Sequence, residues 1–189
     1  MSLTVSVTMK LTLVFLAALA VVAISRPQSE IPENMSMIDG LTKYSPPIIS
    51  NAINSFSQKG KDALTKIDEA SEEFRKAGKT FCADKFAAML KELSPEDYQK
   101  LVDAGKELES EVRKLSQPIQ DLFKKVRKFR CFSGVMLFKG KAMWTTGNAA
   151  TAEELKEITE AVKNLTPDDQ EAYFKLMPVA KKFLETVSA

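Results

Sequence analysis

The sequence predicts an all-α protein, a single compact multi-helix domain preceded by an export signal. Apolar residues recur at helical spacing beyond residue 46, and no stretch alternates apolar and polar side chains long enough to indicate a sheet. Ser-Pro and Thr-Pro steps, typical of helix starts, separate the periodic stretches. The chain has 189 residues, of which 44% are hydrophobic and 28% charged, as in a globular domain with a sizeable core.

The first 25 residues have the parts of a secretory signal peptide. Lys10 precedes an uncharged apolar run over 11–24, and the small residues Ala23 and Ser25 end it. This run is short for a membrane span, which needs about 20 residues, so a retained signal anchor is the less favoured alternative. We therefore expect residues 1–25 to be removed and the protein to be secreted into the extracellular space.

Residues 26–45 contain Pro, Ser, Glu and Asn with little periodicity, which predicts a flexible N-terminal segment before a helical domain over 46–189. Asn34-Met35-Ser36 within this segment is an N-glycosylation sequon. Asn164-Leu165-Thr166 is a second sequon, but Pro167 and a helical setting disfavour its use.

The first three predicted helices follow from apolar periodicity. Pro46-Pro47 suits a helix start, and the apolar side chains of that helix run from Ile48 to Phe56. A second helix carries Leu64 to Phe74 and ends near Gly78. A third carries Phe81 to Leu93. Each presents one apolar stripe to a core.

Helix caps mark the later elements. Ser94-Pro95-Glu96-Asp97 opens a helix whose stripe runs from Tyr98 to Leu115, and Ser116-Gln117-Pro118 restarts the chain toward Phe129. Thr151-Ala152-Glu153-Glu154 is a capping box. Thr166-Pro167-Asp168-Asp169 opens the next helix, which Pro178 interrupts before Ala180 to Val187. The three Ser/Thr-x-x-acid motifs also fit an acidophilic kinase pattern, although capping explains them all. The apolar, Gly-interrupted stretch 132–150 fits either a buried helix or a mobile flap.

Composition excludes several classes of function. The chain has no His, which removes Ser-His-Asp and Cys-His catalysis and His-ligated zinc. Two Cys cannot hold a Cys₄ zinc site or an iron–sulfur cluster. A net charge of +2 is too balanced for a dedicated nucleic-acid binder. We therefore expect no enzyme activity, no metal or other cofactor and no nucleic-acid partner.

The two cysteines have a simple interpretation in an exported protein. Cys82 and Cys131 are too far apart in sequence for a CxxC redox motif, and an oxidising compartment favours one structural disulfide. Two separately buried thiols are the alternative.

Two features suggest a binding function. The 8 Met and 11 Phe supply flexible and flat side chains that can line an adaptable apolar cavity, although such stripes are more often plain core. Basic residues cluster in the Pro118 helix and directly after it. Positive charges at this position are favourable near the C-terminal end of the helix dipole. They could also attract a ligand carboxylate or a membrane phosphate. These are Lys124, Lys125, Arg127, Lys128 and Arg130.

The order of several motifs resembles the nematode fatty-acid- and retinol-binding proteins. The resemblance covers residues 86–186 and rests on the stretches 90–100 and 115–126, the Leu165-Thr-Pro-Asp-Asp turn and Phe174-Lys-Leu-Met-Pro178. It implies a small secreted helical protein with an internal apolar cavity for fatty acids and retinol. Transient contact with a membrane surface is a further expectation.

The residues expected to line the cavity are chosen from the apolar helix faces. They are Phe86, Met89, Leu101, Leu108, Val112, Leu122, Phe123, Val126, Leu155, Ile158, Val162, Phe174 and Met177. Arg127 or Arg130 is the candidate partner for a ligand carboxylate at the entrance. The alternative function is a secreted protein-interaction module with a filled core, whose outer faces bind another protein.

Overall fold

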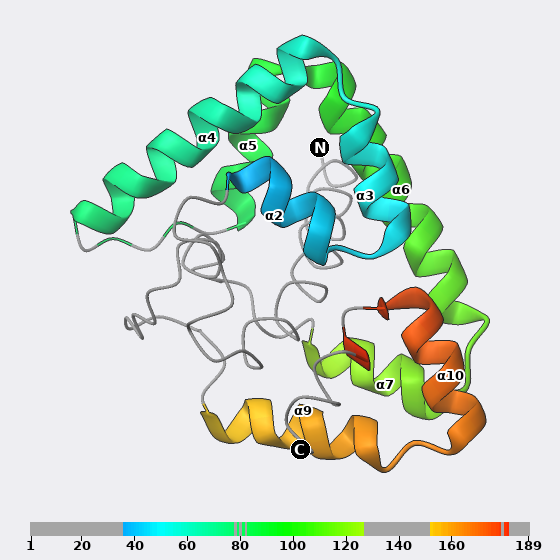
Figure 1. Cartoon of the computed structure of the whole chain (residues 1–189). Coiled ribbons are helices and arrows are strands. Elements are labelled where there is room, and N and C mark those ends of the chain that lie inside the picture. Colours follow the sequence, from blue (N-terminus) through cyan, green and yellow to red (C-terminus); the bar gives the residue numbers. More distant parts are fainter. Residues whose placement is uncertain are drawn as a thin grey trace, which may run out of the picture.

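The computed structural model describes residues 36–77, 79, 81, 83–126, 152–178 and 180–181. Within these ranges the chain forms α-helices joined by short turns, with no strand, which confirms the predicted all-α class (Figure 1). The leader 1–25, Asn34 and the stretch 132–150 lie outside the described residues. In the same ranges no helix is both long enough and apolar enough to span a bilayer.

Five described helices form the first part of the fold and three the second. The first five are α2 (Met37–Tyr44), α3 (Pro47–Asn54), α4 (Gln58–Lys76), α5 (Ala83–Leu93) and α6 (Pro95–Arg113). The other three are α7 (Gln117–Val126), α9 (Ala152–Lys163) and α10 (Pro167–Leu176). Most boundaries agree with the predicted caps, and α10 ends two residues before Pro178, as the missing proline N–H predicts.

Helix α2 differs from the expected flexible segment over 26–45. The Ser36 hydroxyl caps it by accepting the Asp39 backbone N–H at 3.1 Å. Leu41 is buried in the core, and the Ser50 hydroxyl of α3 donates to the Thr42 carbonyl at 2.7 Å. The helix has only eight residues, too few to be stable in isolation, and these tertiary contacts hold it in place.

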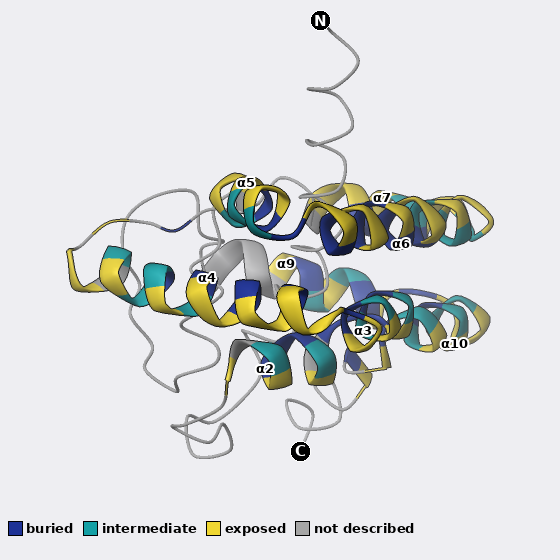
Figure 2. Ribbon diagram, turned by 90° about the horizontal axis from the view of Figure 1, so that it is seen from above, coloured by how far each residue is buried: buried dark blue, intermediate teal, exposed yellow. Residues whose placement is uncertain are grey.

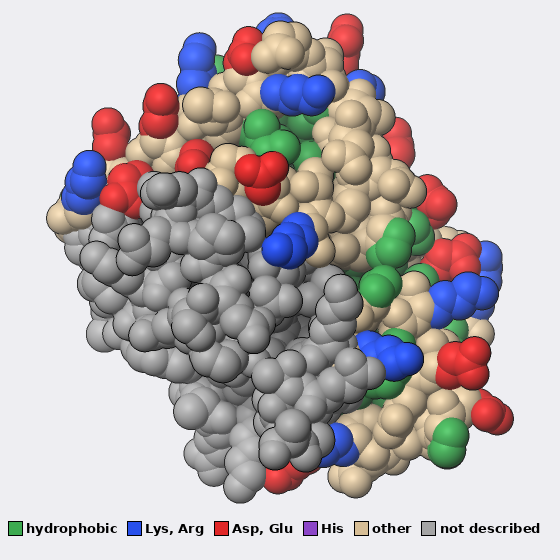
Figure 3. Space-filling model, viewed as in Figure 1, with side chains coloured by type: hydrophobic (Ala, Val, Ile, Leu, Met, Phe, Trp, Pro, Cys, Tyr) green, Lys and Arg blue, Asp and Glu red, His purple; other side chains and the backbone are tan. Residues whose placement is uncertain are grey.

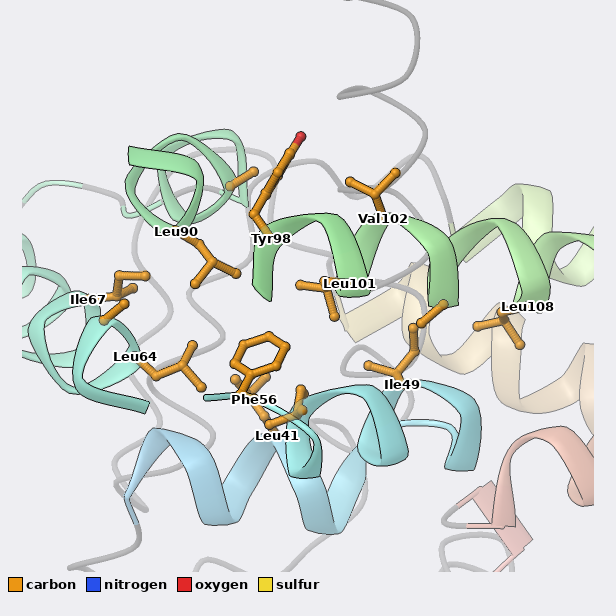
Figure 4. Close-up of a cluster of buried hydrophobic side chains, with 14 of the residues drawn as sticks. Leu41, Ile49, Phe56, Leu64, Ile67, Leu90, Tyr98, Leu101, Val102 and Leu108 are labelled. Carbon is orange, nitrogen blue, oxygen red and sulfur yellow. The ribbon is translucent and has the colours of Figure 1, made fainter. Parts of the chain in front are cut away.

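The first hydrophobic cluster lies among α2 to α6. Helix α3 packs against α2 and α6, and α5 packs against α4 and α6. Figure 4 shows side chains from all of these elements pointing toward one another, among them Leu41, Ile49, Leu64, Leu90 and Leu101. Phe74 and Phe81 meet edge to face at 5.6 Å between ring centroids, which joins the end of α4 to the segment before α5.

The second hydrophobic cluster lies among α7, α9 and α10. Its buried members include Ile119 of α7 and Tyr173 of α10, with Ile158 and Val162 from α9. Helix α6 packs against helices of the first cluster, and its C-terminal end leads to α7 and the second (Figure 1). Helix α6 is therefore the link between the two clusters.

The outer surface of the described residues is polar. Each residue classed there as exposed is charged, polar, Ala or Pro, and none is a large apolar residue. Figure 2 shows the buried stripes of the helices turned inward and the exposed stripes outward. Figure 3 shows acidic and basic side chains scattered over one face, with small groups of hydrophobic side chains visible between them. The amphipathic pattern read from the sequence therefore matches the orientation of the helices.

Candidate functional site

The predicted cavity-lining residues of the first half lie in the first hydrophobic cluster. Leu101 and Leu108 of α6 are buried there. Phe86 and Met89 of α5 pack against the cluster but remain partly accessible. Helices α5 and α6 are in contact, and these side chains belong to one hydrophobic cluster.

The predicted residues of the second half lie in the second cluster. Leu122, Phe123, Ile158, Val162 and Met177 are buried there, and Phe174 packs against them while partly accessible. Aromatic rings connect α7 with α10, since Phe123 and Phe174 each lie 5.8 Å from Tyr173 between ring centroids. Burial raises the pKa of the Tyr173 phenol above its ordinary value of 10.0, because the low-dielectric surroundings disfavour the phenolate.

Val112 and Leu176 form the seam between the two clusters. Val112 lies near the end of α6 and Leu176 at the end of α10, and each packs against both clusters. Both are only half-buried. The structure therefore divides the predicted lining residues between two clusters that meet at this seam.

Several predicted residues lie outside the part that can be described. The side chains of Val126 and Leu155 are not described, although both residues belong to described helices. Arg127, Arg130 and both cysteines, Cys82 and Cys131, lie entirely outside the described residues, so the carboxylate contact and the disulfide remain predictions. Tyr173 and Leu176 were not among the predicted site residues, although their helical spacing placed both on the apolar stripe of α10.

A buried carboxylate network lies beside the first cluster. Asp97 has a side chain with 0% exposure and accepts four hydrogen bonds. Ser57 donates two of them, from its backbone N–H at 3.1 Å and its hydroxyl at 2.5 Å. The Ser94 hydroxyl and the Lys100 ammonium each donate one at 2.8 Å. The Lys100 ammonium also donates to the Ser55 carbonyl at 2.7 Å. We call these groups the Asp97 network.

The Asp97 network joins three helices at their ends. Ser57 precedes α4, Ser94 precedes α6, and Ser55 follows α3. Two helix N-termini thus direct their positive dipole ends toward one carboxylate. Burial by itself raises the pKa of Asp97, but the hydrogen bonds from Lys100, Ser57 and Ser94 outweigh it and hold the pKa far below its ordinary value of 3.8. The carboxylate is charged at physiological pH and its acceptor sites are occupied, which suits a structural anchor and not a general base.

Gly60 is required by the same network. Its backbone N–H donates to the Ser57 hydroxyl at 3.1 Å. A Cβ built on Gly60 would overlap the Asp97 carboxylate, with Cγ only 2.6 Å away. Glycine is therefore the residue that lets the first turn of α4 approach Asp97.

Structural hydrogen bonds account for two of the three Ser/Thr-x-x-acid motifs, although only Thr166 caps its helix through its side chain. Ser94 is 2% exposed and its hydroxyl donates to Asp97, so it is inaccessible in the folded chain. The Thr166 hydroxyl accepts the Asp169 backbone N–H at 3.2 Å and caps α10. Thr151 lies outside the described residues.

The remaining polar groups form surface pairs. Lys124 of the predicted basic cluster pairs with Asp121 at 2.7 Å, and both side chains are more than half exposed. Such pairs contribute little to stability. Within the described ranges, no three His, Cys, Asp or Glu residues come together in a way that could hold a metal ion.

Comparison with protein-family models, with curated proteins and with solved structures finds no match to this chain. The similarity to the nematode fatty-acid- and retinol-binding proteins therefore remains a resemblance in sequence.

Proposed function

We propose that this protein is a secreted, non-catalytic carrier that binds fatty acids or retinol between its amphipathic helices. The observation that carries the proposal is the seam, where half-buried Val112 and Leu176 connect two apolar clusters. Apolar side chains that stay partly accessible between two cores offer a surface on which an acyl chain or a retinoid can be buried.

The partly accessible residues on either side of the seam support the same proposal. Phe86 and Met89 flank the first cluster, and Phe174 flanks the second. Flexible Met and flat Phe side chains adapt to ligands of different shape. The described outer surface carries no large exposed apolar residue, which gives the alternative of an apolar docking face on the outside less support.

Displacement of a fluorescent fatty acid from delipidated protein tests the proposal. Val112→Trp places a bulky ring at the seam and is expected to weaken binding at least tenfold. Ser110→Trp adds the same ring to the exposed face of α6 and is the matched control, with binding unchanged.

Leu122→Asp is a harsher variant, because it puts an unpaired charge at a buried position of α7 and is expected to abolish uptake. Circular dichroism separates loss of binding from loss of the fold. If folded Val112→Trp protein binds the probe as well as the Ser110→Trp control does, the seam is not the ligand site.

A further inference from the structure

The two glycosylation sequons share a structural feature that the sequence alone does not reveal. In each, the hydroxyl residue is the N-cap of a helix. Ser36 accepts the Asp39 backbone N–H at 3.1 Å before α2, and Thr166 accepts the Asp169 backbone N–H at 3.2 Å before α10. The sequon asparagine therefore lies two residues before the N-cap and three before the first residue of the helix. Asn164 is the one whose surroundings are described.

Asn164 lies in the turn between α9 and α10, not within a helix as the sequence had suggested. Its backbone N–H donates to the Glu160 carbonyl at 2.9 Å and closes the last turn of α9. Its side chain is exposed, and the described part of the chain gives its amide no hydrogen-bond partner.

The turn holds Asn164 at the surface. The next residue, Leu165, is 9% exposed and belongs to the second cluster, so it anchors the turn to the core. Lys163, Pro167 and Asp168 around it are all exposed. A bulky hydrophilic group on Asn164 would extend into water and displace no packed side chain.

We infer that Asn164 is an acceptor site for an N-linked glycan, an inference that rests on the proposed export of the chain. The donor would be a lipid-linked oligosaccharide diphosphate. The amide nitrogen of Asn164 bonds to the anomeric carbon of the sugar and loses one proton, while the lipid diphosphate leaves with the electron pair of the broken bond. The exposed turn leaves room for the glycan after folding.

Pro167 sets the expected extent of modification. The proline ring restricts the backbone of the preceding residue, Thr166, and so limits the shapes that the sequon can adopt at the transferring enzyme. Part of the secreted protein is therefore expected to carry the glycan. Replacing the ring by Pro167→Ala is expected to raise that fraction at least twofold.

The experiment is secretion of the full chain from a eukaryotic host, with Asn34→Gln introduced so that Asn164 is the remaining sequon under test. Peptide N-glycosidase, which converts a glycosylated asparagine to aspartate, is followed by peptide mapping. The expected result is conversion at position 164 that disappears in Asn164→Gln. Thr166→Asp is the matched control, because aspartate still caps α10 but no longer completes the sequon, so conversion is lost while the helical content is kept.

Two results would overturn the inference: position 164 remains unconverted in the Asn34→Gln protein, or conversion persists in Thr166→Asp. Lipid binding is measured separately on unglycosylated protein from bacteria. Failure of the carrier function and failure of this modification are therefore distinguishable.

Discussion

Replacing Asp97 by asparagine is expected to destabilise the fold strongly. The substitution keeps the volume but removes the charge and leaves Ser57, Ser94 and Lys100 facing an amide that can accept fewer of their hydrogen bonds. Hydrogen bonds to a charged group contribute about 1.5–3 kcal/mol each, and breaking a buried ion pair costs about 3–5 kcal/mol. Because Lys100 is partly exposed, we take the lower end and expect a loss of about 3 kcal/mol.

Urea denaturation followed by circular dichroism measures this loss. For a chain of this size, about 3 kcal/mol corresponds to a fall in melting temperature of roughly 6–12 °C. Asp103→Asn is the control on the same helix, since that carboxylate is 59% exposed and pairs with Lys106 at the surface. The control is expected to change stability by less than about 0.5 kcal/mol. If Asp97→Asn is as stable as Asp103→Asn, the network does not anchor the helices.

Acid titration tests the same network, because the direction of the Asp97 pKa shift predicts how stability changes with pH. The pKa of Asp97 is lower in the folded than in the unfolded chain, so the unfolded state takes up the proton first as pH falls. The stabilisation is complete above the ordinary value of 3.8 and is lost progressively below it. The stability difference between the native protein and Asp97→Asn should therefore shrink as the solution is acidified, and a constant difference would contradict this linkage.

Three further predictions concern other residues. Gly60→Ala should lower the free energy of unfolding by about 1–3 kcal/mol, because the added methyl group overlaps Asp97. In an Asp97→Ala background the same substitution should be neutral or stabilising, which a double-mutant cycle in urea measures. In an alkaline absorbance titration, Tyr173 should ionise only together with unfolding, because burial raises its pKa in the folded chain. The unfolded chain ionises first, so stability falls as pH rises above the ordinary value of 10.0. Ionisation in the folded protein would refute its burial. In denaturant without reductant, Cys82 and Cys131 should resist alkylation, and two freely alkylated thiols would rule the disulfide out. Closing a loop of about 50 residues should stabilise the fold by about 4 kcal/mol.

The sequence was sufficient to predict the fold class and most helix starts, because helix caps are local. Ser94 and Thr166 mark their helices through contacts with residues three positions away. Helix α2 was missed, since its stability depends on burial of Leu41 against other helices. The Asp97 network could not be predicted from the sequence either, because Ser57 lies 40 residues from Asp97 and no local sequence pattern indicates that they are in contact.

The candidate site was predicted less completely, for a related reason. An apolar stripe predicts that Leu101 or Leu122 is buried, but it does not say which helix each will face. The structure places these two side chains in different clusters and identifies Val112 as a link between them. The inward apolar faces of the helices were therefore predictable, whereas the division of these faces between two clusters was not.

The carrier function is tested most directly by the affinity of delipidated protein for saturated fatty acids of decreasing chain length. Burial of each methylene contributes about 0.8 kcal/mol, so the dissociation constant should rise roughly fourfold for each methylene removed. The longest chains should bind at about micromolar concentration once the cost of association is included. Saturable binding with this dependence on chain length is the predicted result. Folded, delipidated protein that shows no binding to saturating oleate or retinol would contradict the proposed function.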